Sequence, residues 1–331
     1  MGEIVLGLIT SHSPLLSVPV ELWTAYAERD KRNPNIYRVP DGKHMTYEDL
    51  LAEADPAIAK EITEEKFKAR HEANQKGIAK VAEALAKAKP DVLIMFGDDQ
   101  QEIFTKDVMP ALCVFWGEKV PFAQRERGFG SDDAAMRAVS EAYGGDGVQE
   151  YPVNADLSLH IIESLNAQEF DVMHMRALEP DKMMSHAFGF VWRRIMSQSG
   201  IIPTVPIHVN TYYPPNQPTP QRCYQLGRAI RAAVESWDSD TRVAVIASGG
   251  ASHFVVDEEV DRQVLKVIQE KDEAGIAALP LNRLQAGTSE NRTWIAAAGV
   301  AEDLDMELFD YVPCYRTPAG TGCAMAFAQW T

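Results

Sequence analysis

The chain has 331 residues, of which 46% are hydrophobic and 24% are charged, as is typical of a globular protein with a full buried core. Its formal net charge of -16 excludes nucleic acids and anionic membranes as expected partners, because phosphate groups would be repelled. The longest apolar runs have the length of strands, far short of the roughly 20 residues that a membrane-spanning helix needs. These properties favour a small organic molecule as the partner.

The N-terminal residues and the cysteines both predict a cytoplasmic protein. Glu3 precedes the first apolar run, and no basic segment does, so this run predicts a core strand and not an export signal. The cysteines lack the paired spacing of a metal site, and we expect reduced, packed thiols. They are Cys113, Cys223, Cys314 and Cys323.

Apolar runs of strand length alternate with segments of helical periodicity, which predicts an α/β fold. Strands are expected at residues 4–9, 92–97, 171–175, 204–209 and 242–248. Helices are expected within 47–89, at 158–167 and at 221–237. Pro90 ends the first helical segment. The proline-rich residues 212–220 predict an ordered or extended loop.

Polar side chains follow several of the predicted strands. Ser11 and His12 follow the first strand, Asp98 and Asp99 follow the second, and residues 249–253 follow a late one. Ligands bind outside the carboxyl ends of strands in open α/β sheets. The sequence therefore predicts one crevice at which these groups converge.

Three histidines are candidates for chemistry, because imidazole binds metals and exchanges protons near neutral pH. His12 stands between a strand and a proline, His253 follows two glycines after a strand, and His186 is expected in a loop that contains glycine. Each has a structural alternative, a hydrogen-bonded loop histidine or one that caps a helix.

Glu290 is the candidate carboxylate. It could instead be a first-turn glutamate of a helix capped by Thr288 or Ser289. Two histidines and one carboxylate on one face of a metal leave positions open for oxygen and substrate, as non-haem Fe(II) chemistry requires.

Seven segments resemble, in the same order, the LigB-type catalytic subunit of class III extradiol ring-cleavage dioxygenases, especially the gallate and 3-O-methylgallate branch. They are ITSHSP, PDVLIMFGDDQQEIF, MSHAFGF, NTYYPPNQPTPQRCYQLGRAI, SGGASHF, AGTSENRTWI and YRTPAGTGCAMAF. The resemblance implies a single LigB-like domain over residues 1–331, with a central mixed sheet flanked by helices. It also implies a ring-cleaving oxidoreductase.

The resemblance implies a role for individual residues. His12 and Glu290 fall on iron ligands of the family, His253 on the acid or base that faces the catechol, and His186 on a second pocket histidine. The second iron histidine is missing, because the chain reads GDDQQE at residues 97–102.

The missing histidine leaves three outcomes open. Gln100, Gln101 or a neighbouring carboxylate could still hold Fe(II); another divalent metal could prefer these oxygen donors; or the site could work without metal. The predicted substrate-binding residues are Tyr212, Tyr213 and Asp99.

The predicted function is the opening of a catecholic or gallate-type ring by O2 at Fe(II). The alternatives are a non-oxygenase enzyme of the same fold, such as a lyase, decarboxylase or hydrolase, and an inactive partner subunit. The expected partners are a small aromatic substrate and O2. We expect a homodimer, to which a separate small accessory subunit could be added.

Overall fold

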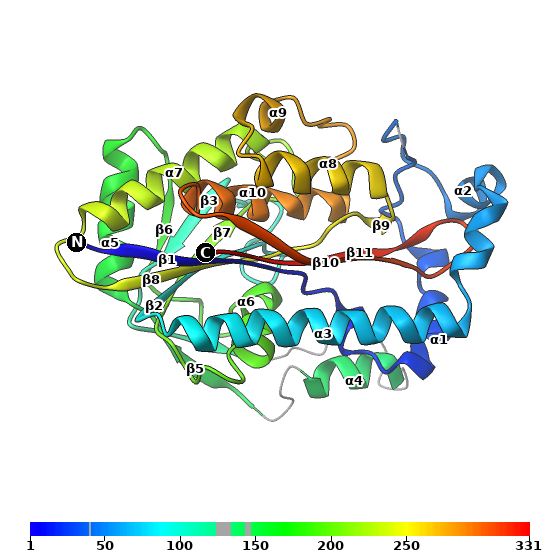
Figure 1. Ribbon diagram of the computed structural model, residues 1–331, viewed down its shortest axis with the longest axis horizontal. Coiled ribbons are helices and arrows are strands. Elements are labelled where there is room, and N and C mark those ends of the chain that lie inside the picture. The colour runs from blue at the N-terminus through cyan, green and yellow to red at the C-terminus, as the bar shows by residue number, and fades with distance from the viewer. Residues whose placement is uncertain (40, 124–133, 143–146) are drawn as a thin grey trace.

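The computed structural model describes residues 1–39, 41–123, 134–142 and 147–331. Its centre is a mixed sheet with the strand order β10-β11-β1-β8-β2-β7-β3-β6, and β9 pairs with β11 (Figure 1). The strands of this sheet are β1 (Glu3–Thr10), β2 (Val92–Gly97), β3 (Leu112–Phe115), β6 (Met173–Met175), β7 (Thr204–Val209), β8 (Arg242–Ser248), β9 (His253–Val255), β10 (Met306–Tyr315) and β11 (Thr321–Trp330). A separate pair joins β4 (Lys119–Phe122) to β5 (Gln149–Pro152).

Strands β1, β8, β2 and β7 run parallel to one another and form the middle of the sheet. Strand β11 lies antiparallel to β1, and β3 lies antiparallel to β7. The carboxyl ends of the central strands therefore meet at one edge, where the loops that follow β1, β2 and β8 come together.

Helices cover both faces of the sheet, as Figure 1 shows for α7, α8 and α10 on one face and α3 and α6 on the other. The helices are α1 (Trp23–Ala27), α2 (Tyr47–Glu53), α3 (Glu64–Ala88), α4 (Ala134–Ala142), α5 (Ala155–Ala167), α6 (His186–Phe190), α7 (Pro220–Ser236), α8 (Glu258–Gln269), α9 (Glu273–Ala277) and α10 (Asn291–Val300). None of the helices in the described ranges is both long and apolar enough to cross a bilayer.

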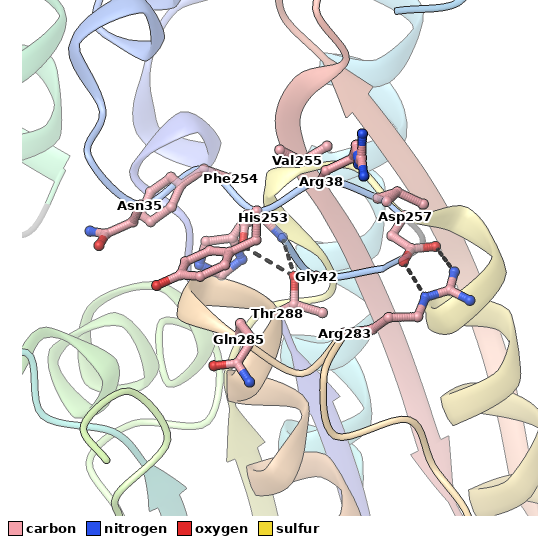
Figure 2. Close-up of a pocket in the computed structure, with 12 residues that line it drawn as sticks. Asn35, Arg38, Gly42, His253, Phe254, Val255, Asp257, Arg283, Gln285 and Thr288 are labelled. Atoms are coloured by element: carbon pink, nitrogen blue, oxygen red, sulfur yellow. Dashed lines mark hydrogen bonds and ion pairs between the residues drawn. The ribbon is translucent and has the colours of Figure 1, made fainter. Parts of the chain in front are cut away.

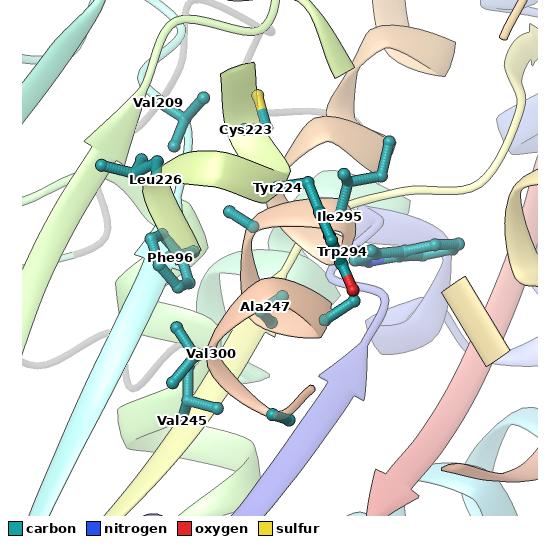
Figure 3. Packing of buried hydrophobic residues seen from close by; sticks show 14 of the residues in the cluster. Phe96, Val209, Cys223, Tyr224, Leu226, Val245, Ala247, Trp294, Ile295 and Val300 are labelled. Carbon is teal, nitrogen blue, oxygen red and sulfur yellow. The ribbon is translucent and has the colours of Figure 1, made fainter. Parts of the chain in front are cut away.

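Each face of the sheet has its own apolar core. On one face, α5, α7, α8 and α10 pack against the sheet around the buried side chains of Phe96, Val245 and Trp294 (Figure 3). On the other face, α3, α4 and α6 pack around Leu93 and Phe327. Strands buried on both faces need apolar side chains at every position, which explains the continuous runs in β2 and β8.

The predicted α/β fold with a mixed sheet flanked by helices is confirmed. All five predicted strands are present, although β6 begins only at Met173. The strands β3, β4, β5, β9, β10 and β11 were not predicted from the sequence. Strand β11 is rich in alanine and glycine, which have low strand propensity, and β10 contains Pro313, which an edge strand tolerates.

Candidate active site

A cavity of about 200 Å³ lies at the carboxyl edge of the parallel strands. Its lining includes His12, Gln100, His186, Tyr212, His253 and Glu290. These residues come from six separate parts of the chain: the ends of β1, β2 and β7, the start of α6, and the segments that precede α8 and α10. The predicted convergence of polar side chains at the strand ends is therefore present.

The orientation of His12 is fixed by a hydrogen bond on the side of the ring that faces away from the cluster of carboxylates. Its Nδ1 lies 3.0 Å from Ser248 Oγ, and that hydroxyl donates to the carbonyl oxygen of Ala187 at 2.7 Å. Because the serine proton is used on Ala187, the His12 Nδ1–H donates to Ser248, and Nε2 is the ring atom that faces Glu290 and would bind a metal once it has lost its proton.

Glu290 stands between two histidines. Its Oε2 lies 3.3 Å from His12 Nε2 and its Oε1 lies 3.3 Å from His253 Nε2. The side-chain amide of Gln100 also donates to Oε1 at 3.3 Å. Burial by itself raises the pKa of Glu290, but the charges of His253 and His12 outweigh burial and hold this pKa well below its ordinary value.

His253 is held at its backbone and at its ring. Thr288 Oγ1 accepts from the His253 amide and donates to its carbonyl, both at 3.2 Å, as Figure 2 shows. The ring Nδ1–H donates to the carbonyl of Ala251 at 2.8 Å, and Nε2 lies 3.1 Å from the hydroxyl of Tyr212. Burial opposes protonation, but Cys323 and Glu290 raise the pKa of His253 well above its ordinary value.

Asp98 directly follows β2 and is fully buried. Neither of its carboxylate oxygens has a hydrogen-bond partner within the part of the chain that the structure describes. One of them lies 3.7 Å from His12 Nε2. Burial, followed by the charge of Glu290, raises the pKa of Asp98 above its ordinary value. A buried carboxylate without hydrogen bonds is costly and calls for a cation.

His186 is the first residue of α6, where the sequence analysis expected a loop. Its Nδ1 lies 2.9 and 3.0 Å from the two carboxylate oxygens of Glu102, and its backbone amide donates to the same carboxylate at 3.1 Å. The ring contacts the ring of His12 edge to face, with centroids 4.7 Å apart. His186 therefore belongs to the same cluster as His12.

The donor set of this cluster fits a divalent metal ion. The ligating atoms of His12, Asp98 and His186 lie within 4.8 Å of one another, and Glu290 lies beside His12. The Asp98 oxygens have no hydrogen bond to satisfy them within the described ranges, and a bound cation would supply that compensation. Imidazoles with carboxylates form the ligand type of non-haem Fe(II) sites.

Other residues that the sequence predicted take different positions. Gln101 is exposed and donates to the hydroxyl of Tyr213 at 3.1 Å. The Asp99 carboxylate accepts from the backbone amides of Ile103 and Phe104 at 2.9 and 3.2 Å. Burial and the charge of Glu102 raise the pKa of Asp99 to about 7. The metal role of Gln101 and the substrate roles of Tyr213 and Asp99 stay predictions.

The sequence analysis missed one wall of the cavity. Tyr26, Arg29 and Arg316 line it together with Met136 and Val139 of α4. Arg316 lies in YRTPAGTGCAMAF, one of the seven segments that carry the resemblance, whereas nothing in the local sequence distinguishes the other four residues from ordinary surface and core positions. Asp98 did carry a signal, because it directly follows a buried strand.

Comparison with known families matches residues 54–323 to the catalytic LigB subunit of aromatic ring-opening dioxygenase. The match covers well over half of the chain. The chain belongs to the LigB family. The resemblance predicted from the seven segments is therefore confirmed at the level of the family.

Curated relatives of this LigB-family chain include dioxygenases of two kinds. A gallate dioxygenase from Pseudomonas putida strain KT2440 is 40% identical over 104 residues, which are 31% of this chain and 29% of the relative. A 2,3-dihydroxyphenylpropionate/2,3-dihydroxicinnamic acid 1,2-dioxygenase from Cupriavidus necator is 27% identical over 164 residues, or 50% and 44% of the two chains. One from Photorhabdus laumondii is 28% identical over 186 residues, or 55% and 50%. The matched regions thus span half or less of these relatives.

Proposed function

We propose that this protein is a dioxygenase that opens an aromatic ring bearing adjacent hydroxyl groups, with a non-haem Fe(II) ion as cofactor. The observation that carries the proposal is the convergence of His12, Asp98 and Glu290 beside the His253–Tyr212 pair. The gallate and 2,3-dihydroxyphenylpropionate dioxygenases among the relatives support substrates of this class.

The cavity has the size of a small aromatic substrate. Its volume is about 200 Å³, and a cavity of roughly 150 Å³ already accommodates a benzene ring. Tyr212, Phe254 and Pro14 supply apolar surface to its lining, while His12, Glu290 and His253 supply polar groups. This combination suits a flat ring whose hydroxyl groups point toward the histidines and carboxylates.

In the proposed site, His12, Asp98 and Glu290 would hold the iron. Bound Fe(II) would supply the redox chemistry through which O2 reacts with an electron-rich ring. Ser248 keeps the Nδ1 proton of His12 in place, so that Nε2 has the lone pair needed for a ligand.

His253 is the proposed acid–base residue that exchanges a proton with a substrate hydroxyl. The Ala251 carbonyl holds the Nδ1 proton, which makes Nε2 the atom that gains or loses a proton at the cavity. The Tyr212 hydroxyl faces that atom at 3.1 Å. Burial, followed by Glu290, raises the pKa of Tyr212 well above 10, so its hydroxyl keeps its proton and acts as a hydrogen-bond donor.

The test is oxygen uptake by protein that has been purified without air and loaded with Fe(II). Gallate, 3-O-methylgallate and protocatechuate are the substrates, and loss of the aromatic absorbance is followed in parallel. We expect O2 consumption equal to ring loss for at least one of them. Bound iron with no oxygen uptake from any of the three would contradict the proposal.

A pair of tyrosine variants tests the assigned geometry. Tyr212→Phe removes the hydroxyl that faces His253, and we expect kcat to fall by about 100-fold, the lower end of the range for general acid–base groups. Tyr224→Phe is the control. The Tyr224 hydroxyl, in α7, donates a hydrogen bond to Glu302, and Tyr224 does not line the cavity. Equal effects of the two substitutions would contradict the role of Tyr212.

We also propose residues 1–331 as one catalytic domain that forms a homodimer in the cytoplasm. Light scattering of the purified protein measures the assembly, and a mass of one chain would contradict the dimer.

A further inference from the structure

The segment that follows β2 provides no imidazole to the metal cluster. Within the GDDQQE segment that lacks the histidine, Gln100 directs its side-chain amide nitrogen to Glu290 Oε1 and donates a hydrogen bond at 3.3 Å. An amide nitrogen does not bind a divalent metal, because its lone pair is delocalised. The same segment contributes a carboxylate instead, that of Asp98. Any second imidazole at the metal would therefore come from another element.

His186 lies where a second imidazole is needed. Its ring contacts the ring of His12, and its ligating atom lies within 4.8 Å of those of His12 and Asp98. The preceding residue, Ser185, donates its hydroxyl hydrogen to the backbone carbonyl of Asp98 at 2.7 Å. This buried hydrogen bond ties the start of α6 to the end of β2, so that His186 and Asp98 are positioned together.

The Glu102 carboxylate orients the His186 ring. It lies 2.9 and 3.0 Å from Nδ1, and it also accepts from the backbone amides of His186 and Gln100 at 3.1 and 3.2 Å. A proton on Nδ1 leaves the ring lone pair on Nε2. Metal-bound histidines commonly donate their other N–H to a carboxylate in this way, which raises their basicity as ligands.

We propose that His186 is the second imidazole ligand of the metal, with Glu102 as the residue that positions it. The inference rests on the proposed metal site and specifies its ligands: His12 and His186 as imidazoles, with Asp98 and Glu290 as carboxylates. The chain thus keeps two histidines at the metal although the segment after β2 has none. The second histidine comes from α6, about 85 residues further along the chain than Gln100.

The first experiment counts imidazoles at the metal directly. Metal-free protein is loaded with Mn²⁺ alone, and electron spin echo modulation detects the nitrogens of coordinated imidazole. We expect two imidazoles in the wild-type protein and one in His186→Gln. His160→Gln is the matched control, because the His160 ring in α5 is hydrogen-bonded to the Ala233 carbonyl and the Ser236 hydroxyl and does not line the cavity.

The second experiment measures affinity. Mn²⁺ and anaerobic Fe²⁺ titrations should give dissociation constants at least tenfold weaker for His186→Gln, and about 10- to 100-fold weaker for Glu102→Gln, the range for residues that orient a ligand. His160→Gln should retain the wild-type value. Thermal unfolding of the metal-free variants checks that each is folded, and Glu102→Gln provides an independent test if His186→Gln does not fold.

The outcomes separate this inference from the proposed function. Two imidazoles in the wild type and one in His186→Gln, without oxygen uptake, would support the ligand set and overturn the ring-cleaving activity. Normal turnover with an unchanged imidazole count in His186→Gln would overturn the ligand set alone. If Gln100→Leu lost the metal while His186→Gln kept it, the second ligand would lie after β2 and the inference would be refuted.

Discussion

Gly287 provides a sharp test of where His253 sits. A Cβ atom added at this position would lie 1.9 Å from His253 Cδ2 and 2.1 Å from Nε2. Non-bonded carbon atoms are normally about 3.5 to 4.0 Å apart, so the ring must move by roughly 1.5 to 2 Å in Gly287→Ala. Such a shift separates Nε2 from Tyr212 and Glu290, which now lie 3.1 and 3.3 Å away.

Two magnitudes follow from this displacement. Misplacement of a reacting group by about 1 Å can lower turnover about 100-fold, and we expect a loss in kcat of at least that size. Overpacking a buried site costs about 1 to 3 kcal/mol of unfolding free energy. The assays are oxygen uptake by the iron-loaded protein and urea unfolding of Gly287→Ala.

A double-mutant cycle isolates the contact with the ring. In a His253→Ala background the added methyl group has space, so Gly287→Ala should cost at least 1 kcal/mol less there than in the wild type, within the usual range for contacting residues. Wild-type stability and turnover in Gly287→Ala would refute the packing of His253 against Gly287. An equal cost in both backgrounds would show that the clash lies elsewhere.

Three further predictions concern the supporting structure. Burial outweighs the hydrogen bonds from Ser252 and Tyr311 and raises the pKa of Asp261 to about 7; its unfolded value is about 3.9. The folded state thus retains a proton that the unfolded state releases. The contribution of Asp261 to the free energy of unfolding is therefore fully present below about pH 4 and is lost as the pH rises through about 7, by up to roughly 4 kcal/mol. Asp261→Asn should flatten urea-unfolding stability between pH 4 and 8, and an unchanged slope would contradict this assignment. Asp30→Asn breaks a buried bidentate pair with Arg316 and should cost about 3 to 5 kcal/mol in the same assay; a loss below 1 kcal/mol would count against it. Free metal at 100 times its dissociation constant should stabilise the fold by about 2.7 kcal/mol, and a chelator that removes the metal should abolish this gain. An unchanged melting temperature after metal removal would argue against the site.

The strands that precede His12, Asp98 and His253 can be predicted from local sequence patterns. Apolar runs such as Val92–Gly97 and Arg242–Ser248 predict strands, because a strand covered on both faces needs apolar residues throughout. Polar residues that follow such runs must lie at the carboxyl edge of the sheet. This rule predicts that His12, Asp98 and His253 lie near one another.

The identities of the interaction partners depended on tertiary structure. His186 and Glu102 lie 84 residues apart in the chain and meet only because α6 packs against the end of β2. No periodicity or spacing encodes that contact. The sequence likewise presents Asp98 and Asp99 as equivalent neighbours, although one carboxylate faces His12 and the other accepts backbone amides of its own loop.

The sequence by itself determined the α/β class, the family and the residues with the chemistry for a metal site, because these follow from local patterns and residue types. The three-dimensional packing decided which of those residues meet, since ligand geometry depends on contacts between segments far apart in the chain. The missing histidine illustrates the difference: the sequence shows that it is absent after β2, and only the packing of α6 brings His186 beside His12.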